Sequence, residues 1–231
     1  MVNKALKIAL ITLSVVSAFL IFAKVELVHR GGPVMIPVLF VSIFAFAIVW
    51  AKLKQFSKYT IDVENLMKNI FERMERQRIK EAIDLCDHTP VPLARILRAG
   101  IMKYDRPKDE IKEAMEDALL YEMPLLEENL SILSTIIQIA PLLGILGTLV
   151  GLIKIFQVIQ ARSAAFVPIA TADLTPGIWE ALICSAAGFL VAIPLLIASN
   201  YLASRVRSFV DEVERAATEL VAFYMERRMP T

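Results

Sequence analysis

Residues 129–153 read NLSILSTIIQIAPLLGILGTLVGLI, and no formal charge lies between Glu128 and Lys154. As a helix rising ~1.5 Å per residue, this stretch is long enough to cross the ~30 Å hydrocarbon core of a bilayer. A soluble helix of this length needs a solvated polar face, which such a run does not provide. The stretch therefore predicts a membrane-spanning helix.

Two further stretches satisfy the same criterion. Residues 31–51 carry no formal charge, and residues 174–204 carry only Glu180. We therefore expect three core spans, over residues 31–51, 129–158 and 174–204. The predicted fold class is all-α: an integral membrane helical protein with three long spans.

The overall composition indicates a second, solvated part. The 231 residues are 57% hydrophobic, yet they include 25 Lys and Arg and 24 Asp and Glu. This mixture is too apolar for one soluble domain and too charged for a wholly buried bundle. A net charge of +1 gives no reason to expect nucleic acid as a partner. Two cysteines do not make a disulfide framework.

Residues 8–23, IALITLSVVSAFLIFA, form a shorter apolar run that follows Lys4 and Lys7. A short apolar run after lysines also resembles a signal peptide, but Ile21 is a poor fit at the small-residue position before a cleavage site. We expect residues 1–28 to form an additional N-terminal helix that spans the membrane or lies at its surface. A cleaved signal remains the alternative.

The distribution of Lys and Arg predicts the orientation. Lysines follow the first span and arginines follow the third, whereas the link over residues 159–173 contains Arg162 alone. Because cytoplasmic loops are enriched in Lys and Arg, residues 52–128 and the tail over 205–231 are predicted to be cytoplasmic. The link between the second and third spans is then periplasmic.

Residues 52–128 show the pattern of a small helical domain. Apolar residues recur at helical spacing in two sets: Leu66, Ile70 and Met74, then Ile111, Met115 and Leu119. Prolines in TPVP (89–92) and DRP (105–107) predict breaks between helices. We expect an amphipathic helical domain in the cytoplasm.

The tail carries a regular apolar seam. It comprises Val206, Val210, Val213, Ala217, Leu220 and Tyr224, spaced alternately by four and three residues. This spacing predicts that the third span continues into the cytoplasm as one helix. The seam packs either against copies of itself or against the protein's own cytoplasmic domain, and the sequence favours neither.

No motif of an enzyme or a metal site is present. The sequence has no phosphate-binding glycine loop ending in Lys-Ser/Thr and no His-Glu-x-x-His. Cys86 and His88 have no second pair at metal-ligand spacing. We therefore predict no enzymatic activity, no cofactor and no metal.

Small residues form faces on the second and third spans. They are Gly144, Gly147 and Gly151 on the second, and Gly177, Ala181, Ser185, Gly188 and Ala192 on the third. Small residues let helices approach closely in lipid, where no hydrophobic force drives helices together. We interpret both faces as helix-packing surfaces.

Thr148 and Ser185 place hydroxyl groups on these faces. Counted from the outer ends of their spans, they lie ~12 and ~16 Å deep. They could bond to their own helices, which is the common role of such hydroxyls. Two hydroxyls at similar depth could also meet and line a proton path through the membrane.

Glu180 is the only charged residue between Asp173 and Arg205. An ionised carboxylate in hydrocarbon costs at least a few kcal/mol, so such residues usually face a cavity or a partner. We include Glu180 in the candidate path. Lys154 lies near the outer end of its span and can extend to the interface, so it is assigned no role.

Neither Thr148 nor Ser185 can gain and lose a proton near neutral pH. A path of this kind needs a carboxylate in series. Either Glu180 supplies it, or a helix of another protein does.

These residues resemble the ExbB/TolQ branch of the ExbB–TolQ–MotA family. The strongest similarity lies in APLLGILGTLVGLIKIFQ (140–157) and LTPGIWEALICSAAGFLVAIPLLIASNYL (174–202). The first span, which begins GGPVMIPVLF (31–40), is moderately similar, and DLCDHTPVPLARILRAGI (84–101) is a weaker match. Within this resemblance, Thr148 matches the threonine of the family's Gly-Thr block, and Glu180 matches the glutamate of its Glu-Ala-Leu block. Ser185 stands where many members have threonine.

The resemblance implies a homopentamer in the bacterial inner membrane. The pentamer would surround a dimer of single-span proteins of the ExbD/TolR type, and an aspartate of that partner would carry the proton. The expected function is a proton-driven motor that couples the proton gradient to work at the outer membrane or envelope. The alternatives are a non-conducting structural scaffold and a flagellar MotA-type stator subunit. A secondary transporter is disfavoured because paired broken helices and internal repeats are not evident.

Overall fold

The structure is a computed structural model that describes residues 30–59 and 63–228. Over these ranges it contains the helices α3 to α9. The residues divide into two compact units, one comprising residues up to Leu53 together with Asn129–Leu202, the other Lys54–Glu128 together with the tail from Ala203. The additional N-terminal helix predicted for residues 1–28 lies outside the described residues.

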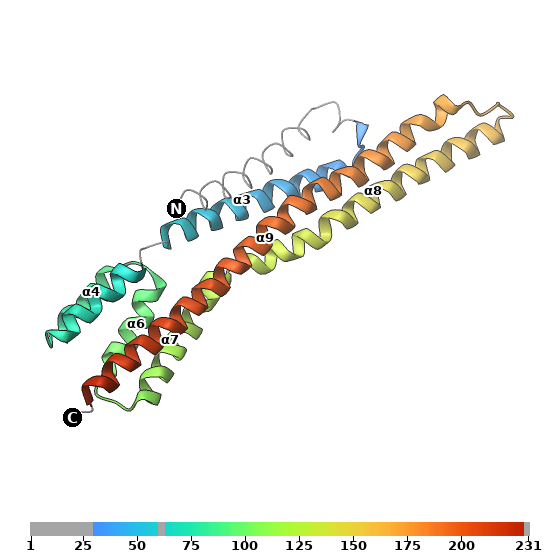
Figure 1. The fold of residues 1–231 in the computed structure, drawn as a ribbon. Coiled ribbons are helices and arrows are strands. Elements are labelled where there is room, and N and C mark those ends of the chain that lie inside the picture. The colour runs from blue at the N-terminus through green and yellow to red at the C-terminus, as the bar shows by residue number, and fades with distance from the viewer. Residues whose placement is uncertain (1–29, 60–62, 229–231) are drawn as a thin grey trace. The chain divides into compact units, whose positions relative to one another are not determined.

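Over the residues that the structure describes, the first unit is built from three long helices. These are α3 (Met35–Tyr59), α8 (Leu130–Ala164) and the first part of α9 (Thr171–Arg228). In this unit α9 runs between α3 and α8 (Figure 1). Met35 and Val38 of α3 pack on Ile183 and Ala187 of α9 in one apolar cluster.

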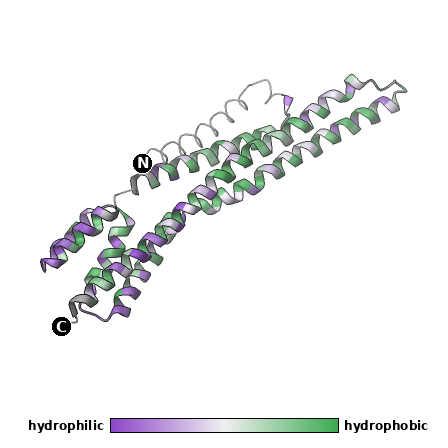
Figure 2. Ribbon diagram, viewed as in Figure 1, coloured by the Kyte–Doolittle hydropathy of each residue, from purple (hydrophilic) through white to green (hydrophobic). Residues whose placement is uncertain are grey.

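The predicted membrane spans are confirmed by length and composition. Three helical stretches are apolar enough to cross a membrane: Met35–Phe56, Lys108–Ala164 and Thr171–Met225. Hydrophobic residues dominate the three long helices of the first unit, as Figure 2 shows. Many of their large apolar side chains are exposed, Phe40 by 73% and Leu142 by 62%, which suits a surface in contact with lipid.

Helical structure continues into the predicted link between the second and third spans. The link was expected over residues 159–173, but α8 continues to Ala164 and α9 begins at Thr171. An ion pair between Arg162 and Asp173 joins the two ends at 2.5 Å.

In its described residues, the second unit contains the end of α3, four shorter helices and the last part of α9. The four are α4 (Val63–Glu75), α5 (Ile79–His88), α6 (Pro92–Met102) and α7 (Lys108–Glu127). The breaks fall at the predicted proline segments, since α5 ends at His88 before Thr89 and Pro90, and α7 begins directly after Pro107. Asn129 adopts a left-handed conformation (φ 64°) between α7 and α8, which separates two helices that would otherwise be continuous.

The seam of the tail packs within its own unit. α9 is a single helix as far as Arg228, which confirms that the third span continues beyond the apolar stretch. Val213, Ala217 and Leu220 are buried in one cluster with residues of α4 to α7, including Ile70 and Met115. The rings of Phe71 and Phe223 stack with their centroids 5.2 Å apart. Of the two alternatives for the seam, the protein's own domain is the one found.

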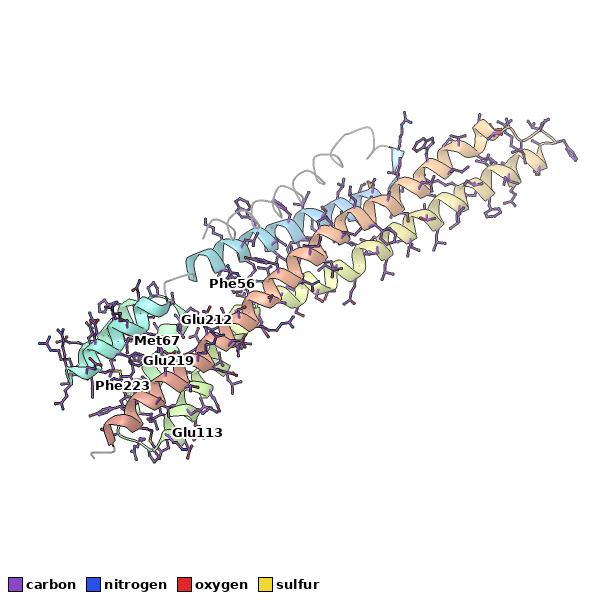
Figure 3. The ribbon with its side chains drawn as sticks, viewed as in Figure 1. Phe56, Met67, Glu113, Glu212, Glu219 and Phe223 are labelled. Carbon is purple, nitrogen blue, oxygen red and sulfur yellow. The ribbon has the colours of Figure 1, made fainter. Side chains whose placement is uncertain are left out.

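Figure 3 shows the same arrangement in its side chains. Met67 on α4 is buried, and Phe223 on α9 packs against the same cluster. Glu113, Glu212 and Glu219 are exposed. The second unit is therefore an amphipathic helical body with a buried apolar interior.

Candidate functional site

The α8–α9 contact is made by backbone against backbone. A Cβ added at Gly188 would lie 2.6 Å from the Ala140 carbonyl oxygen, and one added at Gly144 would lie 3.0 Å from the Cys184 carbonyl oxygen. A side chain at Gly188 would collide with this backbone, and one at Gly144 would force the neighbouring carbonyl to shift by a few tenths of an ångström. The glycines are therefore required for the two helices to approach this closely.

Toward the α8–α9 link, the contact continues through Gly151 and Gly177. A Cβ at Gly151 would lie 2.7 Å from the Gly177 carbonyl oxygen and 2.8 Å from Cβ of Ala181. The small-residue faces of the two spans thus meet each other along several turns. Gly147 differs, because its added Cβ would collide with the side chain of Cys184 and approach Val34, so it points toward the side where α3 packs.

Thr148 lies at the edge of this contact. Its Oγ1 is 3.3 Å from the Gly144 carbonyl oxygen of its own helix and 3.1 Å from the Ala181 carbonyl oxygen of α9. The hydroxyl has one hydrogen to donate, so it alternates between the two carbonyls. It therefore bonds within its helix, as such hydroxyls commonly do, and also across to the neighbouring helix.

Ser185 follows Ala181 by one helical turn on the same side of α9. It is half-buried, and its carbonyl oxygen would lie 3.2 Å from a Cβ at Gly144. Thr148 and Ser185 therefore occupy neighbouring layers of one α8–α9 contact. As acceptors, both hydroxyl oxygens retain lone pairs that could hold water or a protonated carboxyl group.

Glu180 lies further toward the link and is paired with Lys154. The Lys154 Nζ is 2.6 Å from both carboxylate oxygens. The Glu180 side chain is only 8% exposed, whereas that of Lys154 is 43% exposed. Lys154, to which the sequence assigned no role, is therefore the partner of the buried carboxylate.

The Glu180 carboxylate also rests against the chain that leads into α3. Gly32 has φ +67°, and a Cβ added there would collide with Oε1 of Glu180. Cys184 Sγ donates a hydrogen bond of 2.9 Å to the Gly31 carbonyl oxygen. The Gly31-Gly32 segment is thus held to α9 by two side chains one turn apart.

An open groove adjoins this ion pair. It measures about 600 Å³. Charged, polar and aromatic side chains line it, together with three small or apolar residues: Arg30, Lys154, Glu180, Thr175 and Trp179, with Gly32, Ala172 and Pro176. Tryptophan and charged side chains gather where a membrane helix meets the headgroup region. The residues that line this groove have the composition typical of a membrane interface.

Within residues 30–59 and 63–228, no group of three or more His, Cys, Asp or Glu side chains is arranged to hold a metal ion. Cys86 is buried, and desolvation raises the pKa of its thiol to about 11. His88 is exposed, and its hydrogen bond with the Asp84 carbonyl oxygen raises its pKa. Neither residue forms a metal centre with the other in this unit.

In the described part of the second unit, the buried carboxylate of Glu122 is paired with Arg95, whose side chain is 49% exposed. Arg95 of α6 donates two hydrogen bonds to Glu122 of α7, from Nε to Oε1 and from Nη2 to Oε2, each of 2.5 Å. Glu122 is 4% exposed. This bidentate pair joins α6 to α7 and is structural.

The fold and the site together define a multi-pass helical membrane protein in which hydroxyl groups lie at the contact between α8 and α9. The family model of the MotA/TolQ/ExbB proton channel family matches residues 88–215. The chain belongs to this family, and it is a multi-pass inner-membrane protein. Its family role is energy transduction through a proton channel.

Individual relatives agree with this assignment. An ExbB-like biopolymer transport protein of Synechocystis sp. is 30% identical over 198 residues, which are 85% of this chain and 77% of the relative. An ExbB homolog of Methanothermobacter thermautotrophicus is 27% identical over 190 residues, 82% of this chain and 66% of the relative. The Tol-Pal system protein TolQ of Pseudomonas aeruginosa is 32% identical over 149 residues, 59% of this chain and 62% of the relative. None of these three is named as an enzyme.

Proposed function

We propose that this chain is the channel-forming subunit of a proton-driven motor complex, in which Thr148 and Ser185 line the proton path. In this proposal five copies surround a dimer of single-span, ExbD/TolR-like proteins, and the complex does work at the outer membrane or envelope. The large loop and the tail face the cytoplasm. One proton crossing 100 mV yields about 2.3 kcal/mol, which is the free energy available for each step.

The observation that supports the proposal most directly is the hydrogen bond from the Thr148 hydroxyl on α8 to the Ala181 carbonyl oxygen on α9. The hydroxyl oxygen lies 3.1 Å from this carbonyl oxygen, in walls that are otherwise apolar. Polar groups in this setting need hydrogen-bonding partners, because hydrocarbon offers none. A partner's aspartate entering this layer would meet two hydroxyl groups, whose hydrogens an ionised carboxylate accepts.

The proton carrier in this proposal is the partner's carboxylate, since neither hydroxyl titrates near neutral pH. Protonation would remove the charge of the aspartate and weaken its attachment beside Thr148 and Ser185. The partner dimer could then rotate against the ring of subunits. Glu180 takes part at the outer end, where its pair with Lys154 stabilises the path rather than relaying the proton.

The experiment is a double substitution, Thr148→Ala with Ser185→Ala, in the assembled complex with its partner. We expect assembly to be intact and gradient-dependent work to be lost. Thr135→Ala is the matched control, because Thr135 is an α8 threonine whose hydroxyl bonds to the Ser131 carbonyl oxygen of its own helix. Full work by the double variant would exclude the lining role.

A non-conducting scaffold is the competing function, and the glycine contacts between α8 and α9 suit it equally well. The hydroxyl substitutions separate the two functions. A scaffold would retain its function with Glu180→Gln and with both hydroxyl substitutions. A proton path would lose function with the hydroxyl substitutions, whatever the effect of Glu180→Gln.

A further inference from the structure

α8 carries a second polar position on the side of the helix where Thr148 lies. Ser134, Gln138, Pro141, Ile145 and Thr148 are spaced by four, three, four and three residues, so they form one strip along the helix. We call these five residues the Thr148 strip. Ser134, Gln138 and Ile145 are exposed in the single chain, and Pro141 and Thr148 are half-buried.

Apart from the hydrogen bond from Thr148 to the Ala181 carbonyl oxygen, the close backbone contacts of α8 with its neighbours lie beside the strip. α9 is met at Ala140, Gly144 and Gly151, and Gly147 points toward Val34. With 100° of rotation per residue, Gly144 lies about 60° and Gly147 about 120° from Pro141, the middle residue of the strip. The exposed members of the strip, Ser134, Gln138 and Ile145, are therefore available to water, lipid or another chain.

Gln138 lies within the hydrocarbon region. It is about ten residues from Glu128, which places its Cα ~15 Å from the inner charged end of the span, roughly half-way through a ~30 Å core. A primary amide without hydrogen-bonding partners costs several kcal/mol in an alkane-like medium. The face that carries Gln138 is therefore a poor surface for lipid acyl chains.

A backbone group adds to the polarity at this level. The carbonyl of Ile137 would normally accept a hydrogen bond from the N–H of residue 141, but residue 141 is proline and has no N–H. Membrane helices satisfy such carbonyls with side chains or ordered water. Two polar groups thus lie on consecutive residues: the amide of Gln138, which belongs to the strip, and the carbonyl of Ile137 beside it.

We propose that Gln138 and the Ile137 carbonyl form a second, inner hydrogen-bonding station of the proton path, holding water between Thr148 and the cytoplasmic end. This inference rests on the proposed function. The station lies ~15 Å from Thr148 along the helix. Gln138 does not titrate, so it orders water, or accepts the partner's protonated carboxyl group, and does not itself release a proton.

The test is the water accessibility of a single thiol in the assembled complex, in membranes. The substitutions are Gln138→Cys, Thr148→Cys and, as the matched control, Thr135→Cys. Thr135 is exposed and one turn from Gln138, but it lies off the strip. The probe is a small, membrane-impermeant ammonium methanethiosulfonate, and the wild-type chain, whose Cys86 and Cys184 are buried, gives the background.

We expect the reagent to label Gln138→Cys and Thr148→Cys at least tenfold faster than Thr135→Cys. Labelling of Thr148→Cys without Gln138→Cys would refute the inner station and leave the proposed function standing. If neither is labelled, the water-filled path itself is wrong. A disulfide between two copies of Gln138→Cys would refute the station in favour of a subunit contact.

An activity measurement provides a second readout. Gln138→Leu removes the amide, keeps a similar volume and is compatible with lipid. We expect it to reduce proton flux about tenfold with the complex intact, whereas Thr135→Val should leave the flux unchanged. Wild-type flux in Gln138→Leu would overturn the inference.

Discussion

Lys154 Nζ lies 2.6 Å from both carboxylate oxygens of Glu180, across the contact between α8 and α9. The two side chains differ in exposure, 43% for the lysine and 8% for the glutamate. This difference in exposure determines the effect of removing either side chain from the pair. A lysine that loses its partner reaches water, whereas a buried carboxylate that loses its partner does not.

The first prediction concerns this asymmetry. Lys154→Met leaves the buried carboxylate unpaired and should lower the free energy of unfolding by about 3 kcal/mol. Glu180→Gln leaves a lysine that can reach the interface and should cost only about 1 kcal/mol. Denaturant titration of the detergent-solubilised protein measures both. Equally small losses of unfolding free energy in the two variants would mean that the Glu180 carboxylate is as exposed as one in a surface ion pair.

The second prediction concerns Gly32. Gly32→Ala places a side chain at φ +67°, which costs about 1–2 kcal/mol for a residue other than glycine, and adds a collision with Glu180. Because the collision partner is a side chain, part of the loss should disappear in a Glu180→Ala background. A double-mutant cycle measures this coupling. Strictly additive losses would show that only the backbone conformation matters.

The third prediction concerns the tail. Leu220 is fully buried, and a Cβ added at Gly100 of α6 would lie 2.9 Å from its Cδ2. Leu220→Ala should therefore destabilise the second unit by about 3 kcal/mol, while Glu219→Ala on the exposed side should have little effect. Helical circular dichroism during thermal unfolding checks both. If the seam joined copies of the chain, Leu220→Ala would instead dissociate the oligomer without unfolding this unit.

The fourth prediction is a pH dependence at Cys86. Burial raises the pKa of this thiol to about 11, from an ordinary value of 9.0. The reactive thiolate is therefore about 100-fold scarcer at pH 8 in the folded chain than in the unfolded one, because each pKa unit is a factor of ten. Iodoacetamide labelling followed by mass spectrometry should show a folded-state rate that still rises about tenfold per pH unit between about pH 9 and 10.

The same shift has a consequence for stability. A thiol whose pKa is raised on folding stabilises the folded state below pH 9, and this contribution is lost as the pH rises from 9 toward 11. The second unit should therefore unfold more easily in this alkaline window. Cys86→Ala should weaken that dependence. An unchanged alkaline profile in the variant would show that other groups cause it.

Much of this protein follows from local sequence. A charge-free run of the length of residues 129–153 has few stable environments other than a bilayer, so the spans could be predicted without any contact information. The prolines at 90, 92 and 107 predicted the helix breaks for a similarly local reason. Thr148, Ser185 and the glycine faces could be found because helical phase tells which residues share one side.

Phase along one helix does not tell which neighbour that side meets. Gly147 was grouped with Gly144 and Gly151, yet it points toward Cys184 and Val34, because it lies on the edge of the face nearest α3. The apolar seam of the tail was equally compatible with a second copy and with the protein's own domain. A heptad pattern indicates that one side of a helix is buried, but it does not identify what covers that side. The folded structure shows that residues of α6 lie beside Leu220.

The sequence by itself determined the membrane helices, their order and the polar residues within them, because hydrocarbon excludes unpaired charges from any helix that crosses it. Only the tertiary structure decided that Lys154 belongs to Glu180. The two residues are 26 positions apart on different helices, and a side chain near the end of a span can extend to water or turn to a partner with equal ease. Packing at Gly151 and Gly177 brings α8 and α9 close enough for Lys154 to reach Glu180. The buried carboxylate needs this partner, because an unpaired buried charge is strongly destabilising.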